Sequence, residues 1–205
     1  MDAADTLDAV REASASELER LGSDKLLVAV TGADLTSDAV REAAITRERG
    51  RASALAAWAD ESGGATANRF ADAASAATER VDRIAGDDAT AADAETDALS
   101  GHLETVDGTA ERVGAGLVAV PLVADRFYLQ VVSFFVNEAD EESADTFREI
   151  RAAAGDLGAA RDALAELDDE GRETARDAAI EAIGVAYEEY AETLNGMGLD
   201  PRPIC

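Results

Sequence analysis

The sequence is poor in the two residue types that most often bind metals and carry catalysis. Among 205 residues there is one cysteine, Cys205, and one histidine, His102. One cysteine cannot form a disulfide within the chain, a CxxC redox motif or a zinc knuckle. One histidine provides no pair for a histidine-based zinc or haem site, and it is the only imidazole base open to a nucleophile. The sequence therefore predicts no catalytic, cofactor-binding or metal-ligating residue, and no cofactor.

Basic residues are scarce as well, and lysine is nearly absent. The chain has 18 Lys and Arg against 44 Asp and Glu, a formal net charge of −26, and Lys25 is its only lysine. Together with the abundance of alanine, this composition is typical of a protein adapted to a salt-saturated cytoplasm. Multimolar salt there screens charges beyond roughly 3 Å, so the acidic excess causes little long-range repulsion.

The acidic balance also disfavours nucleic acid as a partner, because nucleic-acid binding requires a basic face. The densest local basic cluster is Arg47, Arg49 and Arg51, which spreads over about half the circumference of a helix. No aromatic side chain is interleaved with these arginines, so the cluster does not resemble a platform for stacking bases.

Strand signals are missing. Only three prolines occur, β-branched and aromatic enrichment is absent, and apolar residues recur at helical spacing almost throughout. The sequence predicts an all-α fold, a single helical domain over residues 1–205, with a polar linker near 86–96 and an extended tail over 199–205. Six or seven helices are expected: 4–30, 36–58, 66–85, 99–117 with a break near Gly114 and Gly116, one opened by Pro121, 143–167 and 173–194.

The segment from Val113 to Val136 is long and apolar enough to be tested as a membrane span. Asp125 and Arg126 would lie near the middle of the bilayer, at a cost of roughly 2.5–3.5 kcal/mol each. A buried bundle helix explains the same pattern without that cost, and residues 127–136 are expected to be central in the fold. The N-terminus has neither the basic nor the apolar region of a secretory signal, which predicts a cytoplasmic protein without membrane contact.

Several local strings are similar to a haloarchaeal family described as rubrerythrin-like, within the ferritin-like superfamily. They are Glu17–Leu27 (ELERLGSDKLL), Trp58–Asp60, Phe134–Val136 (FFV) and the terminal GMGLDPRPIC. This resemblance covers essentially the whole chain and implies a ferritin-like bundle. Members of the superfamily hold two irons with a Glu from each of two helices and two Glu-x-x-His motifs.

The resemblance also implies where such ligands would fall in this chain. The first Glu corresponds to Glu17, and the second-helix motif corresponds to Glu48 through Arg51, with an arginine at the position of the histidine. The third-helix motif falls on Ala73–Thr78, which holds neither Glu nor His. A guanidinium has no lone pair for a metal, and alanine has none either. The sequence therefore predicts that this chain lacks the di-iron ligands.

Three functional hypotheses follow. The first is a metal-free ferritin-like bundle that acts through a protein partner or self-association, in an interaction or structural role. The second is a regulatory protein such as a transcription antitermination factor, a label carried by some relatives in the family that the chain resembles. The third is a carboxylate-bridged di-iron oxidoreductase with unusual ligands.

Overall fold

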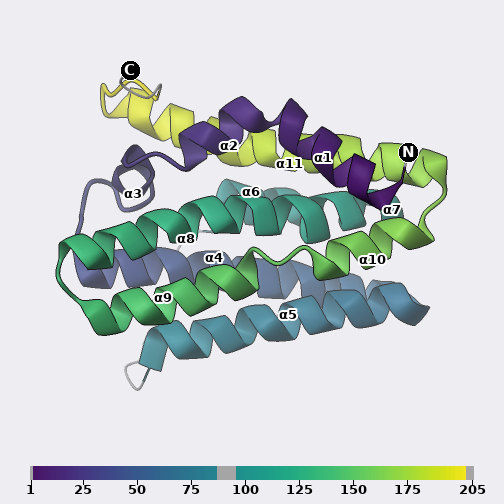
Figure 1. Cartoon of the computed structure of the whole chain (residues 1–205), viewed down its shortest axis with the longest axis horizontal. Coiled ribbons are helices and arrows are strands. Elements are labelled where there is room, and N and C mark those ends of the chain that lie inside the picture. The colour runs from purple at the N-terminus through teal and green to yellow at the C-terminus, as the bar shows by residue number, and fades with distance from the viewer. Residues whose placement is uncertain (1, 87–95, 202–205) are drawn as a thin grey trace.

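The computed structural model describes residues 2–86 and 96–201, and the regular secondary structure in these two stretches is entirely helical (Figure 1). The predicted all-α class is confirmed. Residues 87–95 of the predicted linker and residues 202–205 of the tail, which include Cys205, lie outside the described residues.

Two long helices, α4 (Ser37–Glu61) and α5 (Gly64–Ala85), form an antiparallel pair that is in contact along its length. Both were expected from the sequence at nearly these bounds. α4 begins where the hydroxyl of Thr36 accepts a hydrogen bond from the backbone N–H of Ala39, as an N-cap residue does. Its buried face repeats every three or four residues and consists of Val40, Ala43, Ala44, Glu48, Arg51, Ala54, Leu55 and Trp58. Two charged residues therefore lie on the apolar face of this helix.

A second pair is formed by α8 (Val120–Asn137) and α9 (Glu141–Ala154), which also pack closely against each other. α9 is followed by α10 (Gly158–Glu166) after a short interruption, where one helix over 143–167 was expected. Ion pairs connect this half of the molecule to α5, between Arg83 and Glu149 and between Arg69 and Glu166. In Figure 1, α4, α5, α8 and α9 run side by side along the long axis of the molecule.

The region around Gly114 and Gly116 differs from its prediction. After α6 (Ala98–Leu103), a helix runs without interruption from Thr109 to Asn137, through α7 (Thr109–Arg112), the π-helical segment η2 (Val113–Ala119) and α8. The expected break at the glycines is wrong, and Pro121 lies inside the continuous helix. The π-helical turns immediately precede Pro121, whose ring and missing N–H disfavour regular α-helical bonding to the preceding turn.

The two glycines of η2 serve close packing. A Cβ on Gly114 would lie 2.0 Å from the carbonyl oxygen of Ala175, and a Cβ on Gly116 would lie 2.5 Å from the ring of Trp58. Both positions therefore allow neighbouring segments to approach more closely than a side chain would permit. The sequence pattern indicated a special role for these glycines but assigned it to a helix break.

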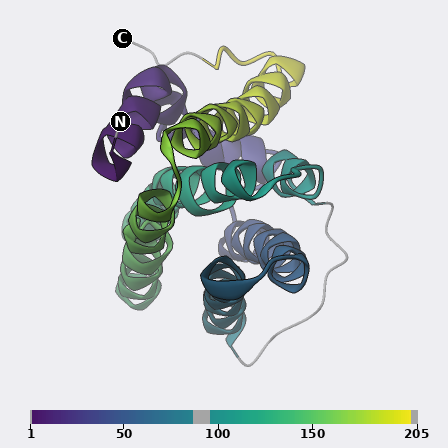
Figure 2. The same ribbon diagram turned by 90° about the vertical axis from the view of Figure 1, so that its right-hand side faces the viewer.

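The N-terminal region is also more divided than expected. In place of one helix over 4–30, the chain forms α1 (Ala3–Ala13), α2 (Ala15–Leu21) and α3 (Lys25–Val30). All three contact α11 (Asp169–Gly196), which begins two residues after Leu167 and is capped by Asp168. Figure 2 shows α1 and α11 together on one side of α8, with α4 and α5 on the other. Because several expected helices are divided, the described chain contains more helical segments than the six or seven predicted.

One helix in the described part of the chain, Thr109–Asn137, is long and apolar enough to cross a membrane by length and composition. Half of its most apolar window is buried inside the molecule, as in the core helix of many soluble proteins. Of residues 127–136, Phe127, Tyr128, Val131 and Phe135 are buried, whereas Val136 is 50% exposed. The segment is central, as expected, but only one of its faces is buried.

Candidate functional site

A buried polar cluster joins three of the four helices that run side by side. Glu48 of α4 accepts hydrogen bonds at both carboxylate oxygens: Oε1 from the hydroxyl of Tyr128 at 2.7 Å, and Oε2 from Nε of Arg80 at 3.0 Å. Nη2 of Arg80 lies 2.8 Å from the same Oε2, and Nη1 of Arg51 lies 3.4 Å from Oε1. We refer to Glu48, Arg51, Arg80 and Tyr128 as the Glu48 cluster. It ties α4 to α5 and α8.

The Glu48 cluster is almost completely shielded from water. Glu48 and Tyr128 are 0% exposed, Arg51 is 1% exposed, and the side chain of Arg80 is 13% exposed. A buried charge requires a partner, because its desolvation is costly. Two guanidinium groups surround one carboxylate, so the protein itself supplies more positive than negative charge at this point. Within the described chain, Nε and Nη2 of Arg51 have no hydrogen-bond partner.

The tyrosine of the cluster is held in its neutral, hydrogen-donating form. Burial raises the pKa of Tyr128 well above its ordinary value of 10.0, and the Glu48 carboxylate next to it raises the pKa further. The positive charges of Arg51 and Arg80 act in the opposite direction but do not reverse the shift. The Tyr128 hydroxyl therefore remains a donor to Glu48 at neutral pH.

A second polar group is centred on Arg47, the residue directly before Glu48 on α4. Nε of Arg47 is 3.5 Å from Asp97, and its Nη2 is 3.7 Å from Glu189 of α11. Its guanidinium also lies over the ring of Phe127, 5.0 Å from the ring centre. Asp97 caps α6, because its Oδ1 accepts from the backbone N–H of Ser100. Arg47 therefore connects α4 with α6, α8 and α11.

Asp97 remains ionised in this setting. Burial by itself would raise the pKa of Asp97, but the positive charges of Arg47 and Arg51, assisted by the N–H of Ser100, outweigh burial. The pKa of Asp97 falls below its ordinary value of 3.8. The positive field of Arg51 thus reaches both Glu48 and Asp97, and the two polar groups are electrostatically linked.

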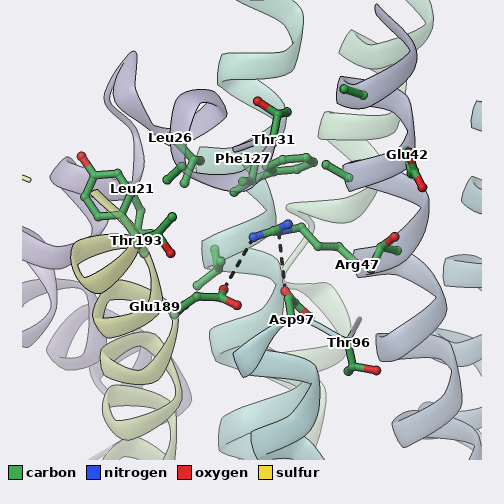
Figure 3. A pocket seen from close by; sticks show the side chains of 18 of the residues that line it. Leu21, Leu26, Thr31, Glu42, Arg47, Thr96, Asp97, Phe127, Glu189 and Thr193 are labelled. Atoms are coloured by element: carbon green, nitrogen blue, oxygen red, sulfur yellow. Dashed lines mark ion pairs between the residues drawn. The ribbon is translucent and has the colours of Figure 1, made fainter. Parts of the chain in front are cut away.

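A pocket of about 430 Å³ opens beside Arg47, between α3, α4, α8 and α11 (Figure 3). Figure 3 shows the guanidinium of Arg47 inside the pocket, with dashed lines to Asp97 and Glu189 below it and the ring of Phe127 above it. Leucine, valine and alanine side chains form much of the wall, including Leu21, Leu26, Val30 and Val123. Asp34 and Glu42 line it as well, and both are exposed to solvent. We refer to this cavity as the Arg47 pocket.

The residues that the resemblance implied for iron are not assembled into a metal site. Glu48 and Arg51 lie in the interior, but Arg51 points its guanidinium at Glu48. Glu17 lies on α2, which packs on α8 and α11, and it takes no part in the Glu48 cluster. Among the described residues, no group of three or more His, Cys, Asp or Glu is placed to hold a metal ion.

The basic cluster considered for nucleic acid is not a surface patch. Arg51 is buried against Glu48, and the side chain of Arg47 is only 12% exposed and is paired with Asp97 and Glu189. Arg49 alone of the three makes no ion pair with any described residue. Two of the three arginines therefore neutralise internal carboxylates and are not available to phosphates.

Three functional residues were missed by the sequence reasoning: Arg80, Tyr128 and Asp97. Each lies far along the chain from its partner on α4. Part of the Glu48 cluster could have been found in the sequence, because Glu48 and Arg51 fall in the same helical register as the apolar residues Ala44, Leu55 and Trp58. That register places a Glu–Arg pair on the apolar face of a helix. His102 is half-buried on α6 and lies outside both polar groups.

Comparison with known proteins provides no further assignment. No protein-family model matches the chain, and neither a curated protein nor a solved structure matches it. The functional argument therefore depends on the helix arrangement, the Glu48 cluster and the Arg47 pocket.

Proposed function

We propose that the chain is a metal-free, ferritin-like helical bundle that acts through a protein partner or through self-association, and not as an enzyme. One observation carries the proposal: both carboxylate oxygens of Glu48, at the centre of the bundle, are engaged by side chains of the protein. In a di-iron protein of the ferritin-like kind, a glutamate on such a helix has an oxygen free for iron.

The arrangement of helices supports the ferritin-like part of the proposal. The pairs α4–α5 and α8–α9 each have a short connection, while the path from the end of α5 to the start of α7 is long. Two helix pairs with one long crossover are the topology of ferritin-like bundles. The Glu48–Tyr128 hydrogen bond joins the two pairs internally, and the Arg83–Glu149 pair joins them at the surface.

The chemistry at the bundle centre supports the metal-free part. Arg51 takes the place of the histidine in a Glu-x-x-His motif, and Arg80 reaches the same carboxylate from α5. Guanidinium groups have only donors, so they cannot ligate a metal and they repel a cation. Their two positive charges offset the negative charge of the buried Glu48. In a di-iron site, the irons offset the negative charge of the carboxylate ligands. The composition supports a halophilic, archaeal and cytoplasmic origin.

Metal loading tests the proposal. Chelator-treated protein is incubated anaerobically with Fe(II) or Mn(II) in molar KCl, desalted and analysed for metal, beside Glu48→Gln as the matched variant. We expect both proteins to retain far less than one metal per chain. Stoichiometric iron in the wild type that is lost in Glu48→Gln would overturn the proposal in favour of the oxidoreductase.

A second measurement tests the interaction role. Light scattering and a pull-down in molar KCl, with and without nuclease, are expected to show a self-associated chain or a protein partner that survives nuclease treatment. Association that disappears with nuclease would support the regulatory alternative and contradict the proposal.

A further inference from the structure

The outer side of α8 is apolar and has no net charge. Residues 113–137 hold only two charged side chains, Asp125 and Arg126, one of each sign, while the whole chain has a net charge of −26. In Figure 1, α8 lies between α2 above it and α9 below it, and it contacts both. Two copies of so acidic a chain meet the least like-charge repulsion where their surfaces are neutral.

Five residues form the side of α8 opposite its buried face: Leu122, Asp125, Arg126, Leu129 and Val136. Helical periodicity places them within about 100° of the circumference. None of the five is buried, and Val136 is 50% exposed. We refer to them as the α8 face. Its apolar members recur every seven residues, which is the period at which two parallel helices pack against each other.

The two charges of the α8 face lie on opposite sides of its apolar residues. Asp125 is on the side of α9, where its Oδ1 accepts a hydrogen bond from Nε of Arg151 at 2.8 Å. Arg126 is on the side of α2, since a Cβ on Gly22 would lie 3.3 Å from its Cδ. Nη1 of Arg126 is 3.9 Å from Oδ2 of Asp125, and Arg126 makes no closer ion pair with any described residue. With side chains 41% and 33% exposed, Arg126 and Asp125 can each accept a closer partner from outside the chain.

A second copy of the chain supplies these partners by symmetry. If the α8 helices of two copies lie parallel about a two-fold axis, each apolar residue of the α8 face meets its own counterpart, Leu122 on Leu122 and Leu129 on Leu129. The same axis sets the α9 side of one copy against the α2 side of the other. Asp125 of each copy then faces Arg126 of the other, so the two α8 faces form two ion pairs and no like-charge pair.

We propose that two copies of the chain associate through the α8 face, with their α8 helices parallel. This inference rests on the proposed function, and it specifies the surface that self-association uses. The contact removes the exposed apolar side chains of both helices from water. The charges fix the orientation, because an antiparallel pair on the same face would bring Arg126 against Arg126 and Asp125 against Asp125.

The oligomeric state in solution tests the proposal. Light scattering and sedimentation equilibrium in molar KCl are expected to give a dimer for the wild type. Leu129→Gln should weaken dimerisation at least about tenfold without changing the circular dichroism spectrum. Leu35→Gln is the matched control, because Leu35 is a 47% exposed leucine outside α8, and it should leave the dimer intact.

The outcomes separate this inference from the proposed function. A monomeric wild type would overturn the inference and leave a different protein partner as the basis of the proposed function. A dimer that Leu129→Gln leaves unchanged would overturn the assignment to the α8 face, while self-association itself would stand.

Charge reversal tests the pairing across the two-fold axis. Arg126→Glu and Asp125→Arg each place like charges in both pairs, so each variant alone should dimerise about three- to tenfold more weakly at the lowest KCl concentration that keeps the protein folded. Arg161→Glu, the same reversal at an exposed arginine of α10, is the matched control and should not weaken the dimer.

An equimolar mixture of the two α8 variants restores opposite charges in both pairs. We therefore expect mixed dimers with close to the wild-type affinity, and circular dichroism checks that Asp125→Arg, which also loses its bond to Arg151, remains folded. Equal weakening by Arg126→Glu and Arg161→Glu, or a mixture of folded variants that associates no better than either alone, would contradict the parallel pairing.

Discussion

The hydroxyl of Tyr128 donates a hydrogen bond to Oε1 of Glu48 over 2.7 Å, which joins α8 to α4 inside the bundle. The same carboxylate receives Arg80 from α5 on its other oxygen. Because the three helices meet at one buried anion, the Glu48 cluster determines how the two helix pairs fit together. Its contacts also leave no oxygen of Glu48 without a donor from the protein.

The first prediction concerns the ionisation of Tyr128. Its pKa is raised in the folded protein, so the unfolded chain loses this proton first as pH rises. Stability is therefore fully present below the ordinary value of 10.0 and falls as pH rises above it. In a spectrophotometric titration, one of the three tyrosines is expected to ionise only on unfolding.

Tyr128→Phe provides the control for that titration. The variant should retain only tyrosines that titrate before unfolding, and it should be less stable at neutral pH by about 1.5–3 kcal/mol, the range for a hydrogen bond to a charged group. Ionisation of all three wild-type tyrosines in the folded state would contradict the buried donor role of Tyr128.

The second prediction concerns Asp97 at acidic pH. Its folded-state pKa is lowered, so the carboxylate contributes stability above the ordinary value of 3.8 and loses it as pH falls through the folded-state pKa. The difference in unfolding free energy between the wild type and Asp97→Asn is expected to be constant above about pH 5 and to shrink in more acidic solution. Urea unfolding at a series of pH values measures it. A difference that stays the same down to the acid-unfolded state would contradict the pairing with Arg47.

The helical class and the α4–α5 pair could be predicted from the sequence because they depend on local periodicity and caps. Thr36, for example, is a cap residue directly before an apolar repeat, and the structure uses it as one. The division of the expected helix over 4–30 was missed, although Ser14 and Gly22 are both residues that favour helix ends. Their effect depends on how α1, α2 and α3 each pack on α11, which is tertiary information.

The Glu48 cluster was predictable only in part for the same reason. The spacing of Glu48 and Arg51 places both on one face of α4, but their burial depends on which face meets α5 and α8. Arg80 and Tyr128 reach Glu48 from 32 and 80 residues away in the sequence. No local pattern connects such positions. The pairing of Arg47 with Asp97 and Glu189 could not be predicted from the sequence for the same reason, because both carboxylates lie far along the chain.

The third prediction concerns the close approach of η2 to α11. Gly114→Ala would place a methyl group 2.0 Å from the Ala175 carbonyl oxygen, so the two helices must separate. We expect a loss of about 1–3 kcal/mol, as for other overpacked interiors. Gly184→Ala is the matched control on α11, since nothing lies within 4 Å of the added carbon, and it should stabilise the helix by about 0.8–1 kcal/mol. Chemical denaturation of both variants measures the contrast, and similar effects would show that η2 is not tightly packed.

The fourth prediction concerns salt. The net charge of −26 disfavours the compact state when screening is weak, as at about 0.1 M KCl with its Debye length of about 10 Å. We expect the melting temperature, followed by circular dichroism, to fall steeply as KCl is lowered from molar concentration to about 0.1 M. Sulfate should stabilise more than chloride at equal ionic strength if weak burial limits the fold. An unchanged melting temperature would show that neither charge repulsion nor a thin core limits stability.

The most direct test of the central claim, that the protein's own guanidinium groups neutralise Glu48, is a double-mutant cycle of Glu48→Gln and Arg51→Met. Glu48→Gln leaves two guanidinium groups without their carboxylate, and we expect it to lose about 3–5 kcal/mol of unfolding free energy. Arg51→Met leaves Glu48 paired with Arg80, so its loss should be smaller. The double variant removes the Glu48–Arg51 pair and leaves Arg80 as the one charge of the cluster, so its loss should be smaller than the sum of the single losses by more than about 1 kcal/mol. Losses that add to within about 0.5 kcal/mol would contradict the claim.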